Sequence, residues 1–441
     1  MPALSRVREQ LGLFWESALP EQQAALQRFL TTSPTVQNPN NSIIPPADEA
    51  RTRLDYAKKL QEKIRKTLNN PRWRFKATHV ATLFVMPIDS LREMANTGLN
   101  PNYYEHINAE CALDMVADLV TFFISGLSRD SDDDDDDDGM SLSESRRKRP
   151  RKAERSSNGN SSAGASSVVT NTPSVQRNPG TRRKYEATKC RDRGKQCIFL
   201  GTANPQVCHI LPWCWNATEI NNRRTTQLLL TMALFGKREW HRLLASAVGA
   251  SDYAWNMIAV NSQLRTWWGK GYWGVKCMSI EPVSGGPKYK VTLQFHWMPE
   301  RSQLPRNRWI SIELGDGQKM LDDLTTWNGN PGDQLRDGGL VAACNPSSCQ
   351  PLLSGHVSHV LLDEKKDAEN MKDMLDLQWA LIRVASLAGA AEVPDSPYDS
   401  DDDSDYGVTE AVHGSSDVEK WLEGTAIATS SREQPKDTTD G

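Results

Sequence analysis

Apolar residues recur every three or four positions in two stretches of the first 125 residues. One series is Leu54, Ala57, Leu60, Ile64 and Leu68, with Lys and Arg filling the other positions. This spacing predicts a helix with one apolar face, and the Asn-Asn-Pro sequence at 69–71 ends it. A second apolar stretch predicts a helix over residues 109–124. The basic face of the first helix either meets a phosphate backbone or is solvated, and solvation is the ordinary case.

Residues 185–392 carry the other regular patterns and most of the fourteen tryptophans, which are core-filling side chains. Alternating apolar and polar positions predict a half-buried strand over 291–297 and another over 310–314. A closing helix ended by Pro394 is predicted from helically spaced apolar residues. Those residues are Met374, Leu377, Leu381, Val384 and Ala388.

Charged, poorly apolar segments separate and follow these regions. Residues 126–184 contain the acidic run 132–138, then a dense basic cluster and Ser, Asn and Gly. Almost nothing there can be buried, which predicts a disordered linker. The tail at 393–441 holds a second acidic run, at 395–405, and is also expected to be disordered. The chain is therefore divided into a helical region (1–125), a linker (126–184), a main folded domain (185–392) and a tail (393–441).

The basic cluster has the composition of a nuclear localisation signal. Its cations fit an acidic import receptor, although a basic segment that merely pairs with the neighbouring aspartates has the same composition. We expect a nuclear protein, and otherwise a cytoplasmic one. The residues concerned are Arg146, Arg147, Lys148, Arg149, Arg151 and Lys152.

Composition adds only broad limits. The 441 residues are enough for two or three domains, and the net charge of -4 exerts no global attraction for nucleic acid. We find no signal peptide and no apolar run long enough to span a membrane, so no membrane partner is expected. The eight cysteines are therefore interpreted as reduced thiols of an intracellular protein.

A group of short motifs in the main domain points to chemistry. Residues 197–200 and 207–211 predict two short strands joined by a Gly/Asn/Pro loop, with His209 on the second. Asn256 opens another apolar run, which leads into a predicted helix at 263–268 and a predicted strand at 272–278. His209 taken alone is better explained as a satisfied core histidine. Asn256 is about equally consistent with a turn or cap residue.

In order and spacing these motifs resemble the HNH endonuclease family, in its fungal branch. The resemblance runs from about Lys189 to Glu392. The matching residues are Arg191, Asp192 and Cys197; His209, Ile210 and Pro212; Asn256 and Ile258; the Phe295-His296-Trp297 strand; and Leu375, Leu377, Gln378 and Trp379 before Ala388-Gly389-Ala390-Ala391.

The resemblance implies an α+β fold: a ββα-metal (HNH-like) core with added strands and helices, beside the helical N-terminal region and the disordered charged segments. It implies metal-dependent hydrolysis of phosphodiesters, in DNA rather than RNA, with Mg²⁺ or Mn²⁺ as the cofactor. His209 would be the general base, for which a near-neutral pKa is suitable. Asn256 would orient it.

The chain departs from the family pattern at the metal site. Arg265 stands where the family has a histidine ligand, and arginine has no lone pair for a metal. Gly269 stands where the branch has Asp, and Cys208, a soft ligand, precedes His209. The metal ligands are therefore unknown; His241, Asp252 and Glu219 are further possible donors. Arg265 and Lys270 are instead assigned to binding nucleic-acid phosphates.

Two further groups have plainer interpretations. His296 and the tryptophans at 267 and 268 are expected to serve the core, although tryptophan can also stack on bases. Cys190, Cys197, Cys208 and Cys214 lack the paired spacing of common zinc sites, so buried thiols are favoured over a structural zinc.

Three functions follow. The first is an HNH nuclease, a hydrolase that needs a divalent metal. The second is a catalytically inactive, nuclear nucleic-acid-binding protein derived from such a nuclease, which needs none. The third is a protein-interaction scaffold that uses the acidic runs and helices. Nicking and DNA-binding assays discriminate among them.

Overall fold

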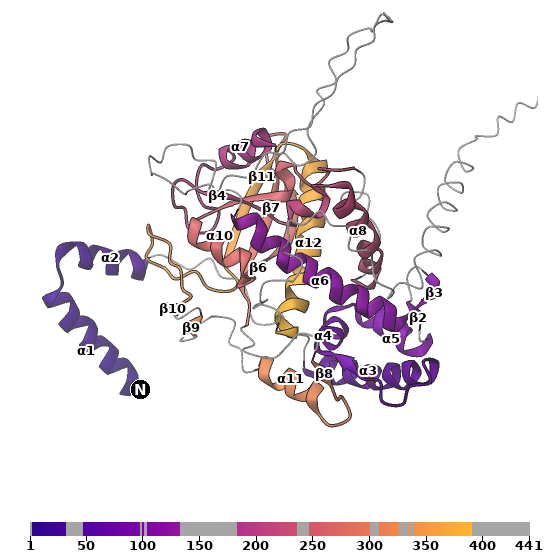
Figure 1. The fold of residues 1–441 in the computed structure, drawn as a ribbon. Helices are drawn as coiled ribbons and strands as arrows, with labels where there is room; N and C mark the ends of the chain where they lie inside the picture. Colours follow the sequence, from indigo (N-terminus) through magenta and orange to yellow (C-terminus); the bar gives the residue numbers. More distant parts are fainter. Residues whose placement is uncertain are drawn as a thin grey trace, which may run out of the picture. The chain divides into compact units, whose positions relative to one another are not determined.

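Helices dominate the fold, and small antiparallel sheets accompany them (Figure 1), which confirms the α+β class. The computed structural model describes residues 2–31, 47–97, 99–100, 104–132, 183–235, 247–299, 308–325, 335–336 and 339–389. The basic cluster at 146–152 and the acidic tail lie outside the described residues. So does the run at 132–138, apart from Asp132.

The helices fall in both parts of the chain. They are α1 (Pro2–Ser17), α2 (Pro20–Thr31), α3 (Ala47–Thr67), α4 (Ala77–Val85), α5 (Ile88–Thr97), α6 (Ala109–Asp132), α7 (Lys184–Asp192), α8 (Glu219–Leu229), α10 (Ser262–Gly269), α11 (Asp316–Thr325) and α12 (Lys365–Ala388), with the 3-10 turns η1 (Trp213–Asn216), η2 (Leu230–Phe235) and η3 (Ala254–Asn256).

The strands are mostly short. They are β1 (Phe75–Lys76), β2 (Leu99–Asn100), β3 (Tyr104–Asn108), β4 (Gln206–His209), β5 (Met257–Val260), β6 (Trp273–Pro282), β7 (Tyr289–Trp297), β8 (Trp309–Ile310), β9 (Leu335–Arg336), β10 (Gly339–Leu340) and β11 (Val357–Leu362). The largest sheet has the order β11-β7-β6, and β4 pairs with β5.

The two long predicted helices form as expected. Leu54, Ala57, Leu60 and Ile64 of α3 are buried, whereas Leu68, expected on the same face, is exposed just beyond the helix. Asn69 then takes a left-handed conformation. The apolar face of α12 is buried along its length. This helix ends at Gly389, whose φ of 83° suits glycine, rather than at Pro394.

Strand predictions were less accurate. β7 covers the expected residues, but its even-numbered positions 294 and 296 are buried too, because α12 lies on that face. The strand expected over 310–314 is wrong: β8 stops at Ile310, and Leu314 is 81% exposed. Of the two short strands expected at 197–200 and 207–211, the second forms as β4, but residues 198–200 form a turn and β4 pairs with the distant β5.

Helix α6 crosses the boundary drawn at residue 125 and packs against later elements (Figure 1). The Trp215 indole donates to the carbonyl of Phe122 at 3.3 Å and stacks on the Phe122 ring. Gly126 approaches Pro212 so closely that a Cβ would lie 2.6 Å from the proline Cβ. One hydrophobic core therefore includes residues from both sides of the 133–182 segment.

Helix α6 also bears on the membrane question. Residues Ala109–Ser128 have the length and apolarity to cross a bilayer, so the expectation that no run is long enough was wrong for this stretch. However, 61% of its most apolar window is buried inside the protein, as in a core helix, so the match is weak support for a membrane span.

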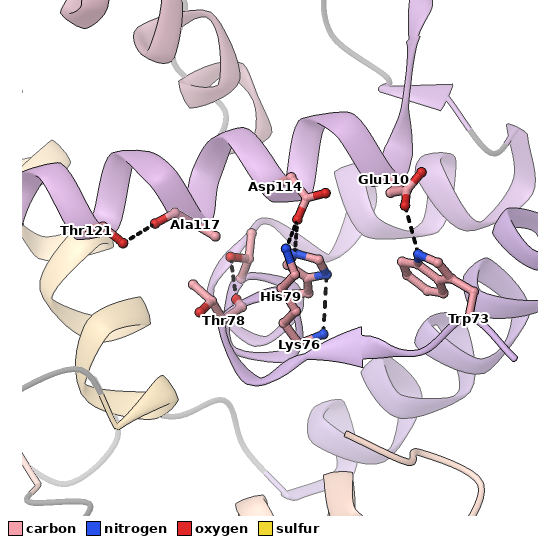
Figure 2. A network of polar contacts seen from close by, with 9 residues as sticks. Trp73, Lys76, Thr78, His79, Glu110, Asp114, Ala117 and Thr121 are labelled. Atoms are coloured by element: carbon pink, nitrogen blue, oxygen red, sulfur yellow. Dashed lines mark hydrogen bonds and ion pairs between the residues drawn. The ribbon is translucent and has the colours of Figure 1, made fainter. Parts of the chain in front are cut away.

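A polar network joins the start of α4 to α6 (Figure 2). His79 Nε2 lies 3.0 Å from Asp114 Oδ1, and the Lys76 ammonium pairs with the same carboxylate. The backbone N–H of Lys76 points to Nδ1 of His79 at 3.4 Å. Burial lowers the pKa of His79, with only partial opposition from Asp114. A neutral His79 thus caps α4 and ties it to α6.

Candidate nucleic-acid interface

His209 is the last residue of β4 and is only 6% exposed. Its backbone pairs with Met257 of β5, and its Nε2 lies 3.1 Å from Oδ1 of Asp252. The environment is thus neither apolar nor open, because a nearly buried imidazole is held by a carboxylate that is itself 2% exposed. Among the three donors named from the sequence, Asp252 is the one beside His209; Glu219 begins α8, and His241 lies outside the described residues.

Asp252 is held from its other side by the segment that begins α7. The backbone N–H of Arg183 donates to Asp252 Oδ2 at 2.5 Å, and the Arg183 guanidinium lies 4.2 Å from the Tyr253 ring centre. Burial would raise the pKa of Asp252, but the hydrogen bond and charge of His209, aided by Arg183, outweigh it and lower that pKa. Asp252 is therefore ionised at neutral pH.

The ionised carboxylate fixes the proton on the imidazole. A carboxylate can only accept hydrogen bonds, so Nε2 of His209 carries the proton. In the neutral ring the lone pair is then on Nδ1. This is the tautomer that a general base needs when Nδ1 is the accepting atom, and the Asp252 charge would stabilise the imidazolium formed by proton transfer.

Asn256 ties the segment after β4 to the segment before β5. Its Oδ1 accepts from the N–H of Leu211, and its Nδ2 donates to the carbonyls of Leu211 and Ser251, each at 3.0 Å. Asn256 is fully buried, and its own carbonyl accepts from Ile210. It thus holds the backbone two residues beyond His209, and this role is more specific than an ordinary turn or cap.

Helix α10 follows β5 and packs on β4. The Trp268 indole donates to the carbonyl of His209 at 3.1 Å. Arg265 lies one turn before Trp268, so the two side chains share a helix face. Arg265 is only 6% exposed, whereas Lys270, at the end of α10, is exposed, with its ammonium 5.9 Å from the Tyr272 ring centre. Lys270 is thus the more accessible of the two cations assigned to phosphate binding.

The loop carrying Asp252 depends on residues that the sequence interpretation missed. Glu186 accepts from the N–H of Ala254 at 2.9 Å, and Arg193 donates to the Ala254 carbonyl at 2.8 Å. Arg193 follows α7 directly, and Arg183 precedes it. The charge density around Arg191 and Asp192 was the available signal, but Arg183 fell within the segment assigned to the linker.

A metal centre has little support from the described side chains. Among them, no group of three or more His, Cys, Asp or Glu residues is arranged to hold an ion. Cys190 packs with Ala254 and Met257, while Cys197 and Cys208 belong to the main core. These three cysteines are buried thiols, and burial raises the pKa of Cys190 to about 11.

His296 has the structural position expected from its strand. It is fully buried, and its ring centre lies 4.9 Å from that of Trp379 on α12. Burial, together with the charges of Lys276 and Arg383, lowers its pKa to about 3. Trp267 and Trp268 are buried as well, so they are core residues and do not offer open stacking surfaces.

Comparisons of the chain with protein-family models, with curated proteins and with solved structures found no match.

Proposed function

We propose that this protein binds nucleic acid, with DNA as the expected partner, through an HNH-like ββα unit made of β4, β5 and α10. One observation carries the proposal: two antiparallel strands and the following helix are joined by the hydrogen bonds of Asn256 and Trp268 around His209. These are two antiparallel strands followed by a helix, the elements of a ββα unit, although β4 pairs with β5 and not with the strand expected at 197–200. Helix α10, which carries Arg265 and is followed by Lys270, packs on β4.

The partial loss of catalytic groups supports binding over cleavage as the first function. Arg265 replaces a metal-ligating histidine with a permanent cation, which can attract a phosphate directly. Binding by phosphate contacts requires no metal and depends strongly on salt. A nuclear protein that binds DNA in this way would leave sequence selection to other contacts.

The binding proposal predicts a measurable salt dependence. We expect fluorescence anisotropy with a labelled duplex to detect binding at low salt. The logarithm of the association constant should fall linearly with the logarithm of the salt concentration. Lys270→Gln should flatten the slope by about 1, because one phosphate contact is lost. Lys288→Gln, in the exposed turn between β6 and β7, is the matched control and should leave the slope unchanged. A wild-type protein without affinity at low salt contradicts the proposal and favours a protein-interaction scaffold.

Phosphodiester hydrolysis is the second candidate function, and the His209–Asp252 pair favours it. Under this proposal His209 would accept a proton from water, and Asp252 would hold the imidazole. A divalent cation such as Mg²⁺ or Mn²⁺ would supply electrophilic assistance at the phosphate when bound. The described residues supply no complete ligand set, so other groups, including those of the substrate, would have to contribute ligands.

A plasmid-nicking assay with Mg²⁺ or Mn²⁺ tests hydrolysis. If the protein has this second function, the wild type nicks supercoiled DNA, and His209→Ala slows the nicking by about 10²- to 10⁴-fold. Asp252→Asn should also slow nicking, because it removes the charge that holds the imidazole. His359→Ala, on exposed β11, is the matched control. Absence of metal-dependent nicking by the wild type would leave binding without cleavage.

A further inference from the structure

The sheet face beneath α12 carries an unusual set of cationic residues. Lys276 of β6 pairs with Gln294 of β7, and the next pair on the same face is Gly274 with His296. Helix α12 lies on this face so closely that a Cβ on Gly274 would be 2.9 Å from Ile382. Lys276 and His296 therefore point toward the helix that carries Trp379 and Arg383.

Arg383 lies deep in this layer, although part of its side chain still reaches solvent. Its guanidinium carbon is 5.4 Å from the Trp379 ring centre, and Nε donates to the Trp379 carbonyl at 3.3 Å. Within the described part of the chain, these are the polar and aromatic contacts of the Arg383 guanidinium. Neither contact supplies a negative charge to balance it.

The neighbouring charges make the position of Arg383 less favourable. Burial, with a smaller contribution from the nearby Arg53, lowers the pKa of Arg383 to about 10. Burial and Arg383 also lower the pKa of Lys276. Arg53 has its own partners, Glu49 and the carbonyls of Leu83 and Met86. A partly buried cation next to other cations costs free energy unless an anion accompanies it.

The acidic group that acts on this cluster is Asp376, which lies about one helical turn before Trp379 on α12. It forms an ion pair with Lys372, four residues earlier, and raises the pKa of Lys276 without overcoming burial and Arg383. Among the described residues, neither Lys276 nor Arg383 has a carboxylate within ion-pair distance. Two positive side chains therefore share about one negative charge, which Lys372 already engages.

We propose that Lys276 and Arg383 form a binding site for an oxyanion, a phosphate group, between α12 and the β6–β7 face. The guanidinium offers two parallel N–H donors, which suit two phosphate oxygens, and the ammonium supplies a point charge. Trp379 holds the guanidinium plane but is itself nearly buried, so it leaves no room for a stacked base. The site recognises a phosphate group, and not a particular nucleoside.

This inference does not depend on the proposed function, since inorganic phosphate is a sufficient probe. In calorimetric titrations at constant ionic strength, we expect phosphate to bind the wild type. Arg383→Gln and Lys276→Gln should each weaken binding by about ten- to a hundredfold, as expected for a lost charged hydrogen bond. Lys365→Gln removes a charge from the exposed start of α12 and should bind as the wild type does.

A stability measurement separates a lost site from a damaged fold. In chloride buffer without phosphate, Arg383→Gln should melt at the same temperature as the wild type or higher, because it removes an uncompensated cation. Phosphate should raise the melting temperature of the wild type only. The proposal is overturned if phosphate does not bind the wild type, or if Arg383→Gln binds it equally well.

Competition identifies the source of the phosphate. If duplex DNA displaces phosphate, and Lys276→Gln weakens duplex binding, the site takes a backbone phosphodiester. If a nucleoside monophosphate displaces phosphate and the duplex does not, the site takes a free phosphomonoester. Either result supports the oxyanion site, and loss of the His209 activities would not affect it.

Discussion

Replacing Asn256 with alanine is expected to lower the free energy of unfolding by roughly 3 to 5 kcal/mol. The buried amide serves the N–H and carbonyl of Leu211 and the carbonyl of Ser251. Alanine would leave these three groups without their side-chain partner where water has little access. Leaving one buried polar group unsatisfied costs about 1 to 3 kcal/mol. Chemical denaturation of the wild type and the variant measures the difference.

Asn261→Ala is the matched control for this loss. Asn261 caps α10 by accepting from the N–H of Gln263, at a more exposed position. Its removal should cost about 1 kcal/mol, the usual worth of a helix cap. Asn256→Asp is a second variant of nearly the same shape: it keeps the acceptor for Leu211 but loses both donors. If Asn256→Ala cost no more than the cap variant, the amide would not be the clamp between β4 and β5.

Acidification is expected to destabilise the protein well before its carboxylates titrate. His296 has a folded-state pKa of about 3, against 6.5 for an ordinary histidine. The unfolded chain therefore binds the proton first, and stability falls as pH drops from 6.5 toward 3. The loss is about 1.4 kcal/mol per pH unit, or about 3 kcal/mol by pH 4.5. His79, with its lowered pKa, adds to the loss in the same direction.

Denaturant titrations between pH 7 and 4.5 measure this slope. Asp114 and Asp252 have lowered pKa values, so the stability they contribute is lost only at pH values below about 4. Asp118 and Asp367 have raised pKa values, so their protonation favours the folded state and opposes the loss.

The buried histidines are expected to set the sign of the slope between pH 6.5 and 4.5. His296→Gln should flatten the slope, whereas His359→Gln, on exposed β11, should not. Equal slopes for the wild type and His296→Gln would contradict the prediction, because they would mean that His296 binds the proton equally in the folded and unfolded states.

Local patterns predicted the long helices because their information lies within a few turns. The spacing of Leu54 to Ile64, and of Met374 to Ala388, identifies a buried face without knowledge of its partner. The same holds for the alternation in β7. The alternation of apolar and polar residues over 310–314 failed as a predictor, because Leu314 is exposed and lies outside any strand.

The candidate site depends on contacts between residues far apart in the sequence. Nothing near His209 indicates that β4 pairs with 257–260 and not with the closer 197–200. Asp252 was one of three possible donors, and only the fold brings it to Nε2 of His209. The roles of Arg183 and Arg193 were missed for the same reason, because backbone contacts across the loop leave no spacing pattern.

The close approach of Gly126 to Pro212, and of Phe122 to Trp215, has a practical consequence for dividing this chain. A fragment ending near residue 132 would expose the apolar side of α6 to water, and a fragment starting near 183 would do the same to Trp215. Each piece alone would tend to aggregate, whereas the two together would complete one interior. A cut between them would leave a nicked protein that stays assembled through side-chain packing and through the backbone pairing of β1 with β8.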